Sequence, residues 1–147
     1  MPSGRRYKLV IIDMLLLIFA LYNSGSTLGQ LTLVNSAGEP HTGEGWALLL
    51  YNGGTVCDDY FGMKEASVIC RHLGYTDALT WGSVEIPNGN NIVTWNVQYN
   101  YAIKLDDVQC PVGGYWNQCT YITSGLSSWC IRTDDVLLYC TGKQFGF

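Results

Sequence analysis

The sequence has few charged residues and no cluster of basic ones. Only 14% of its 147 residues are charged, and eight Lys and Arg oppose twelve Asp and Glu, which gives a net charge of −4. Because phosphate contacts dominate the affinity of proteins for nucleic acids, DNA and RNA are excluded as partners. The chain also lacks a Gly-x-Ser-x-Gly turn, and its only histidines are His41 and His72. We therefore predict that it is not an enzyme.

A hydrophobic run long enough to span a membrane is missing as well. The uninterrupted apolar stretch Met14–Tyr22 is about half the length that a bilayer requires. Three bases precede it within residues 5–8, and small polar residues follow, which is the layout of a secretory signal peptide. We predict a signal peptide over residues 1–29, with cleavage after Ser26 or an uncleaved anchor as alternatives. The remaining chain would be secreted, with five basic and eleven acidic residues and no stable membrane span.

Closely spaced cysteine pairs, which zinc sites use, are also absent. The shortest cysteine spacing is nine positions, so a zinc site is disfavoured. An even number of cysteines behind a signal peptide is typical of a disulfide framework, here of three bridges. Spacing alone leaves fifteen connectivities open. The six cysteines are Cys57, Cys70, Cys110, Cys119, Cys130 and Cys140.

Glycines and aromatic residues are plentiful, with 17 Gly, 10 Tyr and 5 Trp, a mix typical of short strands joined by turns. Alternation and turn residues predict strands over 31–34, 45–51 and 55–57, the last two joined by a hairpin turn at Asn52–Gly53. Residues 136–140 form a further predicted strand, and residues 92–101 a strand or an ordered loop.

One segment has the period of a helix. Its apolar residues recur at Ala66, Ile69, Cys70 and Leu73, which predicts a helix over residues 63–73 that ends at Gly74. No internal repeat is present, so solenoids and propellers are excluded.

The order of these motifs resembles the scavenger receptor cysteine-rich family. The resemblance rests on three stretches, which read Glu44-Gly-Trp46 with Tyr51-Asn-Gly-Gly-Thr-Val-Cys-Asp-Asp59, then Ala66-Ser-Val-Ile-Cys-Arg-His-Leu-Gly-Tyr75, then Leu105-Asp-Asp-Val-Gln-Cys110. It extends from about residue 31 to residue 140. We therefore expect such a domain over residues 30–142, of the six-cysteine (group A-like) type, followed by a short tail over residues 143–147.

This resemblance implies a fold and a disulfide pattern. The fold is of the α+β class, a curved antiparallel β-sheet that cradles one α-helix. The implied bridges are Cys57–Cys130, Cys70–Cys140 and Cys110–Cys119. The sequence departs from the family pattern in a shortened turn at 52–54, in a longer segment over 81–101, and in Trp129 and Asp134 where the family has Asn and Glu.

Acidic pairs are the main chemical feature of the sequence. Clustered carboxylates without a neighbouring base are natural ligands for Ca²⁺. By family position, one Ca²⁺ site would comprise Asp58, Asp59 and Asp134, whereas a second at Asp106 and Asp107 is impaired by Trp129. Alternatively, these carboxylates cap turns and helix ends, and Asp59 is close enough to the helix start for that role.

The expected function is ligand binding outside the cell. The resemblance implies a Ca²⁺-assisted, non-enzymatic module whose partners are polyanionic microbial surfaces or extracellular proteins. Since bases are few, a bound cation, or a few of these bases beside it, would make the contact with a polyanion. The alternative is a structural matrix component that assembles through its aromatic loop. The candidate ligand-surface residues are Lys104, Arg132, Trp95, Tyr99 and Tyr101.

Overall fold

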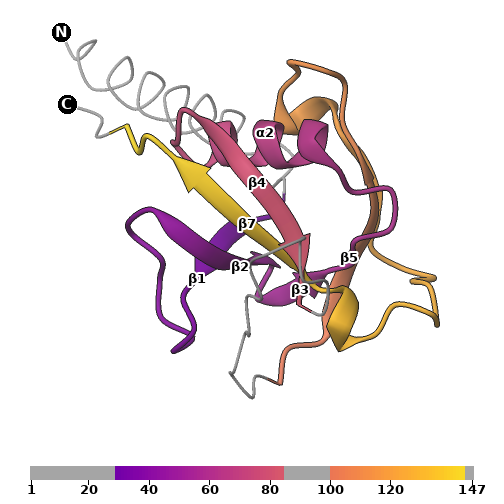
Figure 1. Ribbon diagram of the computed structural model, residues 1–147. Coiled ribbons are helices and arrows are strands. Elements are labelled where there is room, and N and C mark those ends of the chain that lie inside the picture. The colour runs from indigo at the N-terminus through magenta and orange to yellow at the C-terminus, as the bar shows by residue number, and fades with distance from the viewer. Residues whose placement is uncertain (1–28, 85–99, 145–147) are drawn as a thin grey trace, which may run out of the picture.

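The computed structural model describes residues 29–84 and 100–144 (Figure 1). The first strands are β1 (Leu31–Val34), β2 (Gly45–Tyr51) and β3 (Gly54–Val56). Strands β2 and β3 form an antiparallel hairpin, in which Asn52 and Gly53 both have positive φ, 48° and 76°. These dihedrals are those of the tight turn that Asn-Gly favours, so the predicted hairpin is confirmed.

The remaining strands complete one mixed sheet. They are β4 (Asp77–Ser83), β5 (Ile103–Gln109), β6 (Thr120–Ile122) and β7 (Val136–Thr141). The order across the sheet is β4-β7-β2-β3-β5-β6, with β1 paired to β2. The α+β class is confirmed. The expectation of a wholly antiparallel sheet needs a correction, because β3 and β5 are parallel.

A long connection explains this parallel pair. Parallel neighbours need a crossover of a dozen residues or more, and the chain between β3 and β5 includes both a helix and β4. Strand β4 was not predicted. Its hydrogen-bonding partner is the buried strand β7, and a register shift between Ala78 and Thr80 interrupts the alternation by which a strand is recognised in sequence.

Helix α2 (Met63–His72) packs against β4 and β7 (Figure 1). Its buried face includes Ala66, Ile69 and Cys70, as the apolar period predicted. The helix ends next to Gly74, which has φ of 87°, a value that glycine adopts without strain. Two short 3₁₀ turns, η1 (Trp116–Gln118) and η2 (Arg132–Asp134), lie in the segment between β5 and β7.

The three disulfides have the connectivity that the resemblance implied. Cys57 is joined to Cys130, Cys70 to Cys140 and Cys110 to Cys119. The second bridge fixes α2 to the central strand β7. Together with the side chains between helix and sheet, it belongs to one buried apolar cluster that includes Ile69, Leu105 and Leu138.

The two ends of the chain lie mostly outside the described residues. The predicted signal peptide over residues 1–29 and the last part of the predicted tail fall there, and their boundaries stay predictions. Within the described ranges, no helix is long and apolar enough to cross a membrane.

Candidate binding surface beside the Cys57–Cys130 disulfide

Strand pairing brings two of the acidic pairs to the same end of the sheet. Val56 of β3 lies in register with Leu105 of the parallel strand β5. Asp58 follows β3 by two residues, and Asp106 follows Leu105 directly. Because the two strands run in the same direction, both acidic pairs lie beyond this register position at the same end of the sheet. An oxygen of Asp59, an oxygen of Asp106 and the sulfur of Cys57 all lie within 4.8 Å of one another.

The disulfide adds the third acidic segment. Cys57 is bonded to Cys130, and it also forms an isolated β-bridge with Asp135. Next to that bridge, the backbone N–H of Asp58 donates to the carbonyl oxygen of Asp134 over 3.0 Å. Carboxylates from three distant parts of the sequence therefore surround one disulfide.

Burial and mutual repulsion disfavour the charged forms of the first two carboxylates. The pKa of Asp58 is raised chiefly by desolvation and then by the charge of Asp134, and the nearby Ser83 hydroxyl partly opposes this shift. The pKa of Asp59 is also raised, first by desolvation and then by the charges of Asp106, Asp107 and Asp134. Raised carboxylate pKa values with carboxylate neighbours mark a region of unneutralised negative potential.

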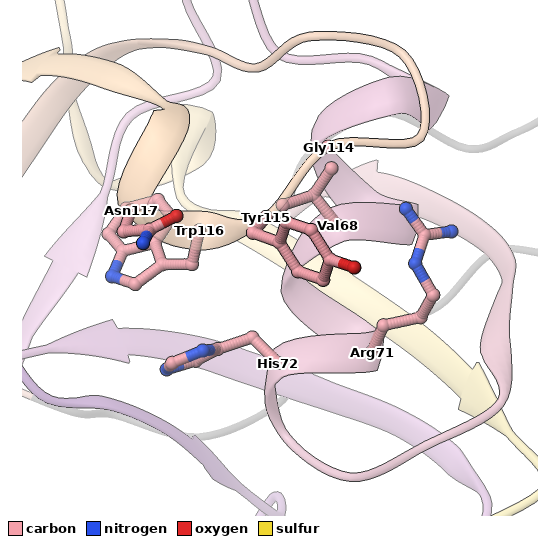
Figure 2. Close-up of a pocket in the computed structure, with 7 residues that line it drawn as sticks. All are labelled: Val68, Arg71, His72, Gly114, Tyr115, Trp116 and Asn117. Carbon is pink, nitrogen blue, oxygen red and sulfur yellow. The ribbon is translucent and has the colours of Figure 1, made fainter.

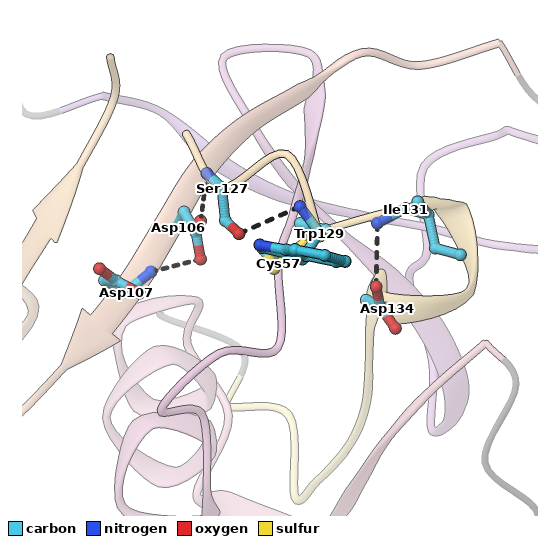
Figure 3. Close-up of a disulfide and its surroundings, with 8 residues drawn as sticks. Cys57, Asp106, Asp107, Ser127, Trp129, Ile131 and Asp134 are labelled. Atoms are coloured by element: carbon cyan, nitrogen blue, oxygen red, sulfur yellow. Dashed lines mark hydrogen bonds between the residues drawn. A yellow bond between two sulfur atoms is a disulfide. The ribbon is translucent and has the colours of Figure 1, made fainter. Parts of the chain in front are cut away.

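Asp106 is fully buried, and its carboxylate accepts hydrogen bonds from two backbone N–H groups. Its Oδ1 accepts the N–H of Asp107 over 2.7 Å, and its Oδ2 accepts the N–H of Ser127 over 3.1 Å (Figure 3). Asp107, with φ of 54°, has the left-handed conformation that Asp tolerates better than most residues. Asp106 thus fixes the loop that carries Cys130, in addition to contributing charge.

Asp134 fixes the other side of the same loop. Its Oδ2 accepts the N–H of Ile131 over 2.9 Å, while Ser127 Oγ accepts the N–H of Trp129 over 3.2 Å. The Trp129 side chain is 87% exposed, and Figure 3 shows it between the Asp106–Asp107 pair and Asp134. A large exposed aromatic ring beside the carboxylates makes this surface a candidate contact region.

The two roles expected for these carboxylates divide among the residues. Asp106 and Asp134 bind loop N–H groups, as the capping alternative expects. Asp59 does not cap helix α2, because Gly62 occupies the N-cap position and no side-chain hydrogen bond caps that end. Asp59 is exposed and faces the other carboxylates, which leaves its oxygens accessible.

The other predicted ligand-surface residues are more scattered. Lys104 is exposed and its Nζ donates to the carbonyl oxygen of Asn52 over 2.9 Å, whereas Arg132 is exposed at the start of η2, two residues from Asp134. Tyr101 is half-buried and packs on a small apolar cluster with Val34 and Leu48. Trp95 and Tyr99 lie outside the described residues.

Sequence reasoning missed one buried acid. Glu65 is 1% exposed, and its Oε1 accepts the N–H of Cys110 over 3.0 Å and lies 3.7 Å from Lys64 Nζ. It thereby ties the first turn of α2 to the end of β5. A glutamate at the third position of a predicted helix was the available signal, since such residues bind backbone N–H groups near helix starts.

Comparison with known proteins agrees with the fold and its disulfides. The profile described as "Scavenger receptor cysteine-rich domain" matches residues 37–141. The chain belongs to this family. Among solved structures, the third SRCR domain of murine neurotrypsin is similar, with a TM-score of 0.52 and 26% identity over 76% of this chain and 95% of that one. At the family level, the SRCR domain is an extracellular ligand-binding module.

Curated relatives share only this domain with the chain. Lysyl oxidase homolog 4 of Homo sapiens is 36% identical over 120 residues, which are 78% of this chain and 14% of that protein. Lysyl oxidase homolog 2 of Gallus gallus is 33% identical over 108 residues, or 69% of this chain and 12% of that protein. The chain thus spans about one seventh of the length of these relatives.

Proposed function

We propose that this SRCR domain is a Ca²⁺-assisted, non-enzymatic binder of anionic extracellular ligands, on microbial surfaces or on extracellular proteins. The carrying observation is the carboxylate group around Cys57–Cys130. The pKa values of Asp58 and Asp59 are raised there, first by desolvation and then by repulsion from their acidic neighbours. A cation that binds between them would remove this repulsion.

The donor set suits a hard cation. Ca²⁺ prefers carboxylate and carbonyl oxygens and tolerates irregular geometry. Cys57 offers no thiolate, because it is bonded to Cys130, so a soft metal has no sulfur ligand here. Asp59 and Asp106 would hold the ion, with Asp58, Asp107 and Asp134 supplying nearby charge. This arrangement merges parts of the two predicted sites into one.

The cation would supply the positive charge that the protein lacks. An acidic surface repels sulfate, phosphate or carboxylate groups, whereas a Ca²⁺ ion with open positions attracts them. The exposed Arg132 beside Asp134 would add one permanent positive charge next to the ion. Trp129 would contact the apolar part of the ligand.

Thermal unfolding with and without Ca²⁺ tests the cation site. Extracellular Ca²⁺ modules bind at about 10⁻⁴–10⁻³ M, so about 10 mM Ca²⁺ should stabilise the domain by about 1.4–2.7 kcal/mol and raise Tm by several degrees. Asp59→Asn should abolish this rise. The substitution should not disturb the fold, because the exposed Asp59 carboxylate accepts no backbone hydrogen bond within the described residues. Glu39→Gln, which changes an exposed acid elsewhere, is the matched control. An unchanged wild-type Tm would refute the site.

A second candidate function is assembly with other matrix proteins through exposed aromatic residues. The observation in its favour is Trp129, which together with the 57% exposed Ile131 presents an apolar surface on either side of Cys130. The relatives named lysyl oxidase homologs carry such a domain as one part of a longer chain. Assembly through apolar contacts would persist in chelator and in high salt, whereas Ca²⁺-bridged anion binding would not.

A further inference from the structure

A cavity of about 360 Å³ lies on the side of helix α2 that faces the η1 segment (Figure 2). Val68, Arg71 and His72 of α2 form one wall, and residues 114–117 form the other. None of these residues belongs to the carboxylate surface around Cys57–Cys130. The volume is at the lower end of the range for small-molecule sites, which suits a ligand with a single ring.

The wall opposite the helix is held in place without a ligand. Tyr115 N–H donates to Gln118 Oε1 over 2.9 Å, Gly114 N–H donates to the carbonyl of Pro111 over 3.0 Å, and Cys110–Cys119 closes the loop. The Tyr115 side chain nevertheless remains 75% exposed at the rim. A rigid backbone that presents an exposed aromatic ring loses little entropy on binding.

The lining of this cavity is mostly apolar, its polar side chains include hydrogen-bond donors, and none of its lining residues is acidic. Arg71 contributes a guanidinium, and Asn117 and His72 contribute an amide and an imidazole. Arg71 Nη1 forms an ion pair with Asp77 Oδ1 over 3.7 Å, which is longer than a hydrogen bond, and that oxygen also accepts the N–H of Ala78 over 2.8 Å. A ligand carboxylate would therefore compete with Asp77 for Arg71, whose planar fork can bind a carboxylate through two parallel hydrogen bonds.

Trp116 provides a second, independent indication. Its side chain is 1% exposed and stacks on Tyr121 at 5.0 Å, yet among the described residues its Nε1–H has no hydrogen-bond partner. Figure 2 shows the nitrogen-bearing ring of this indole on the side where His72 lies, and the two ring centres are 6.3 Å apart. His72 is exposed, so rotation of its side chain would give a ligand access to the unpaired donor.

We propose that this cavity binds a six-membered ring that carries a carboxylate. The ring would lie against Tyr115 and Val68, and the carboxylate would accept hydrogen bonds from Arg71 at one end of the cavity (Figure 2). An acceptor atom of the ring substituents would reach Trp116 Nε1. The chemistry is shared by uronic acid sugars and by aromatic acids, and the experiment distinguishes these two sources.

Titration of the ¹⁵N-labelled domain followed by NMR tests the proposal, with EDTA present so that the Ca²⁺ site plays no part. The probes are glucuronate and benzoate, and the controls are glucose and benzyl alcohol, which lack the carboxylate. We expect saturable shifts of the Trp116 indole N–H and of amides 114–117 with one or both acids. No saturable shift with either acid, or equal shifts with the neutral controls, would overturn the proposal.

Variants locate the ligand. Arg71→Met should weaken binding at least about tenfold, because it removes a charge-assisted hydrogen-bond pair. Lys64→Met removes an exposed base at the other end of α2, away from the cavity, and should leave binding unchanged. Tyr115→Ala, at an exposed position, tests ring stacking without disturbing the core. Equal binding by the Arg71→Met and wild-type domains would overturn the assignment, whether or not the Ca²⁺ site proves correct.

Discussion

At the residue scale, Glu65 is the buried carboxyl group that ties helix α2 to the end of β5. Its carboxylate satisfies the N–H of Cys110, and Cys110 is 4% exposed. Glu65→Ala would leave that donor buried and unpaired, at a cost of about 1–3 kcal/mol in the free energy of unfolding. Urea unfolding should show this loss, whereas Glu39→Ala at an exposed position should change stability by less than about 0.5 kcal/mol. Equal effects of the two substitutions would contradict this role.

The raised pKa of Asp58 predicts how stability responds to pH. A pKa above the ordinary 3.8 means that the folded state binds the proton more tightly than the unfolded state. Its contribution to stability is therefore fully present below pH 3.8 and is lost as pH rises through the raised folded pKa. Asp59 acts in the same direction. The pKa of Asp77 is lowered, mainly by a hydrogen bond from Ser67, so its contribution has the opposite sign.

Asp58→Asn should accordingly stabilise the domain near neutral pH in EDTA. The amide removes the cost of burying a charge and the repulsion from Asp134, while it keeps a polar group near Ser83. Differential scanning calorimetry at several pH values between about 4 and 7 should show the gain in Tm shrinking towards acid. A gain that is largest at pH 4 would contradict the assignment.

The sequence identified these carboxylates but not their grouping. Their spacing and the resemblance to the family pointed to Asp58, Asp59 and Asp134 as one set. In the structure, Asp59 and Asp106 come within 4.8 Å because β3 and β5 are parallel neighbours, a pairing that no local pattern encodes. The sequence shows directly which residues are acidic, whereas which of them become neighbours in space depends on contacts between distant segments.

At the scale of elements, the three disulfides differ in how much chain they close. The sequence separations are 70 for Cys70–Cys140 and 9 for Cys110–Cys119. On the chain-entropy model, removing the first bridge costs about 4.5 kcal/mol and removing the second about 2.5 kcal/mol. Paired Cys→Ala variants, compared by urea unfolding, should therefore differ by about 2 kcal/mol. A costlier loss of the short bridge would show that local structure around η1, and not chain entropy, dominates.

Elements with strong local signals were predicted, and those set by long-range pairing were not. The Asn52–Gly53 turn and the apolar face of α2 are encoded by adjacent residues, and both are confirmed. Strand β4 is a strand because β7 pairs with it, despite a shift in register. The disulfide connectivity came from the family resemblance, since cysteine spacing alone left it open.

At the scale of the whole molecule, the excess of acids sets the conditions for ligand binding. The chain has a net charge of −4, so a polyanion approaches against a repulsive field unless a cation intervenes. The two proposed sites supply positive charge in different ways. One holds Ca²⁺ among carboxylates, and the other places Arg71 in a cavity that has no acidic lining residue.

Binding to immobilised dextran sulfate tests this electrostatic account. We expect binding with Ca²⁺ at millimolar levels, loss of binding in EDTA, and weakening as NaCl rises from about 0.05 to 0.5 M, because salt shortens the range of the attraction. Asp59→Asn should abolish the Ca²⁺-dependent part, and Arg132→Met should weaken it several-fold.

Trp129→Ala separates the candidate functions. It should reduce dextran sulfate binding only slightly if Ca²⁺ bridging dominates, whereas self-association or matrix binding that resists both EDTA and salt, but is lost in Trp129→Ala, would favour assembly through the aromatic surface.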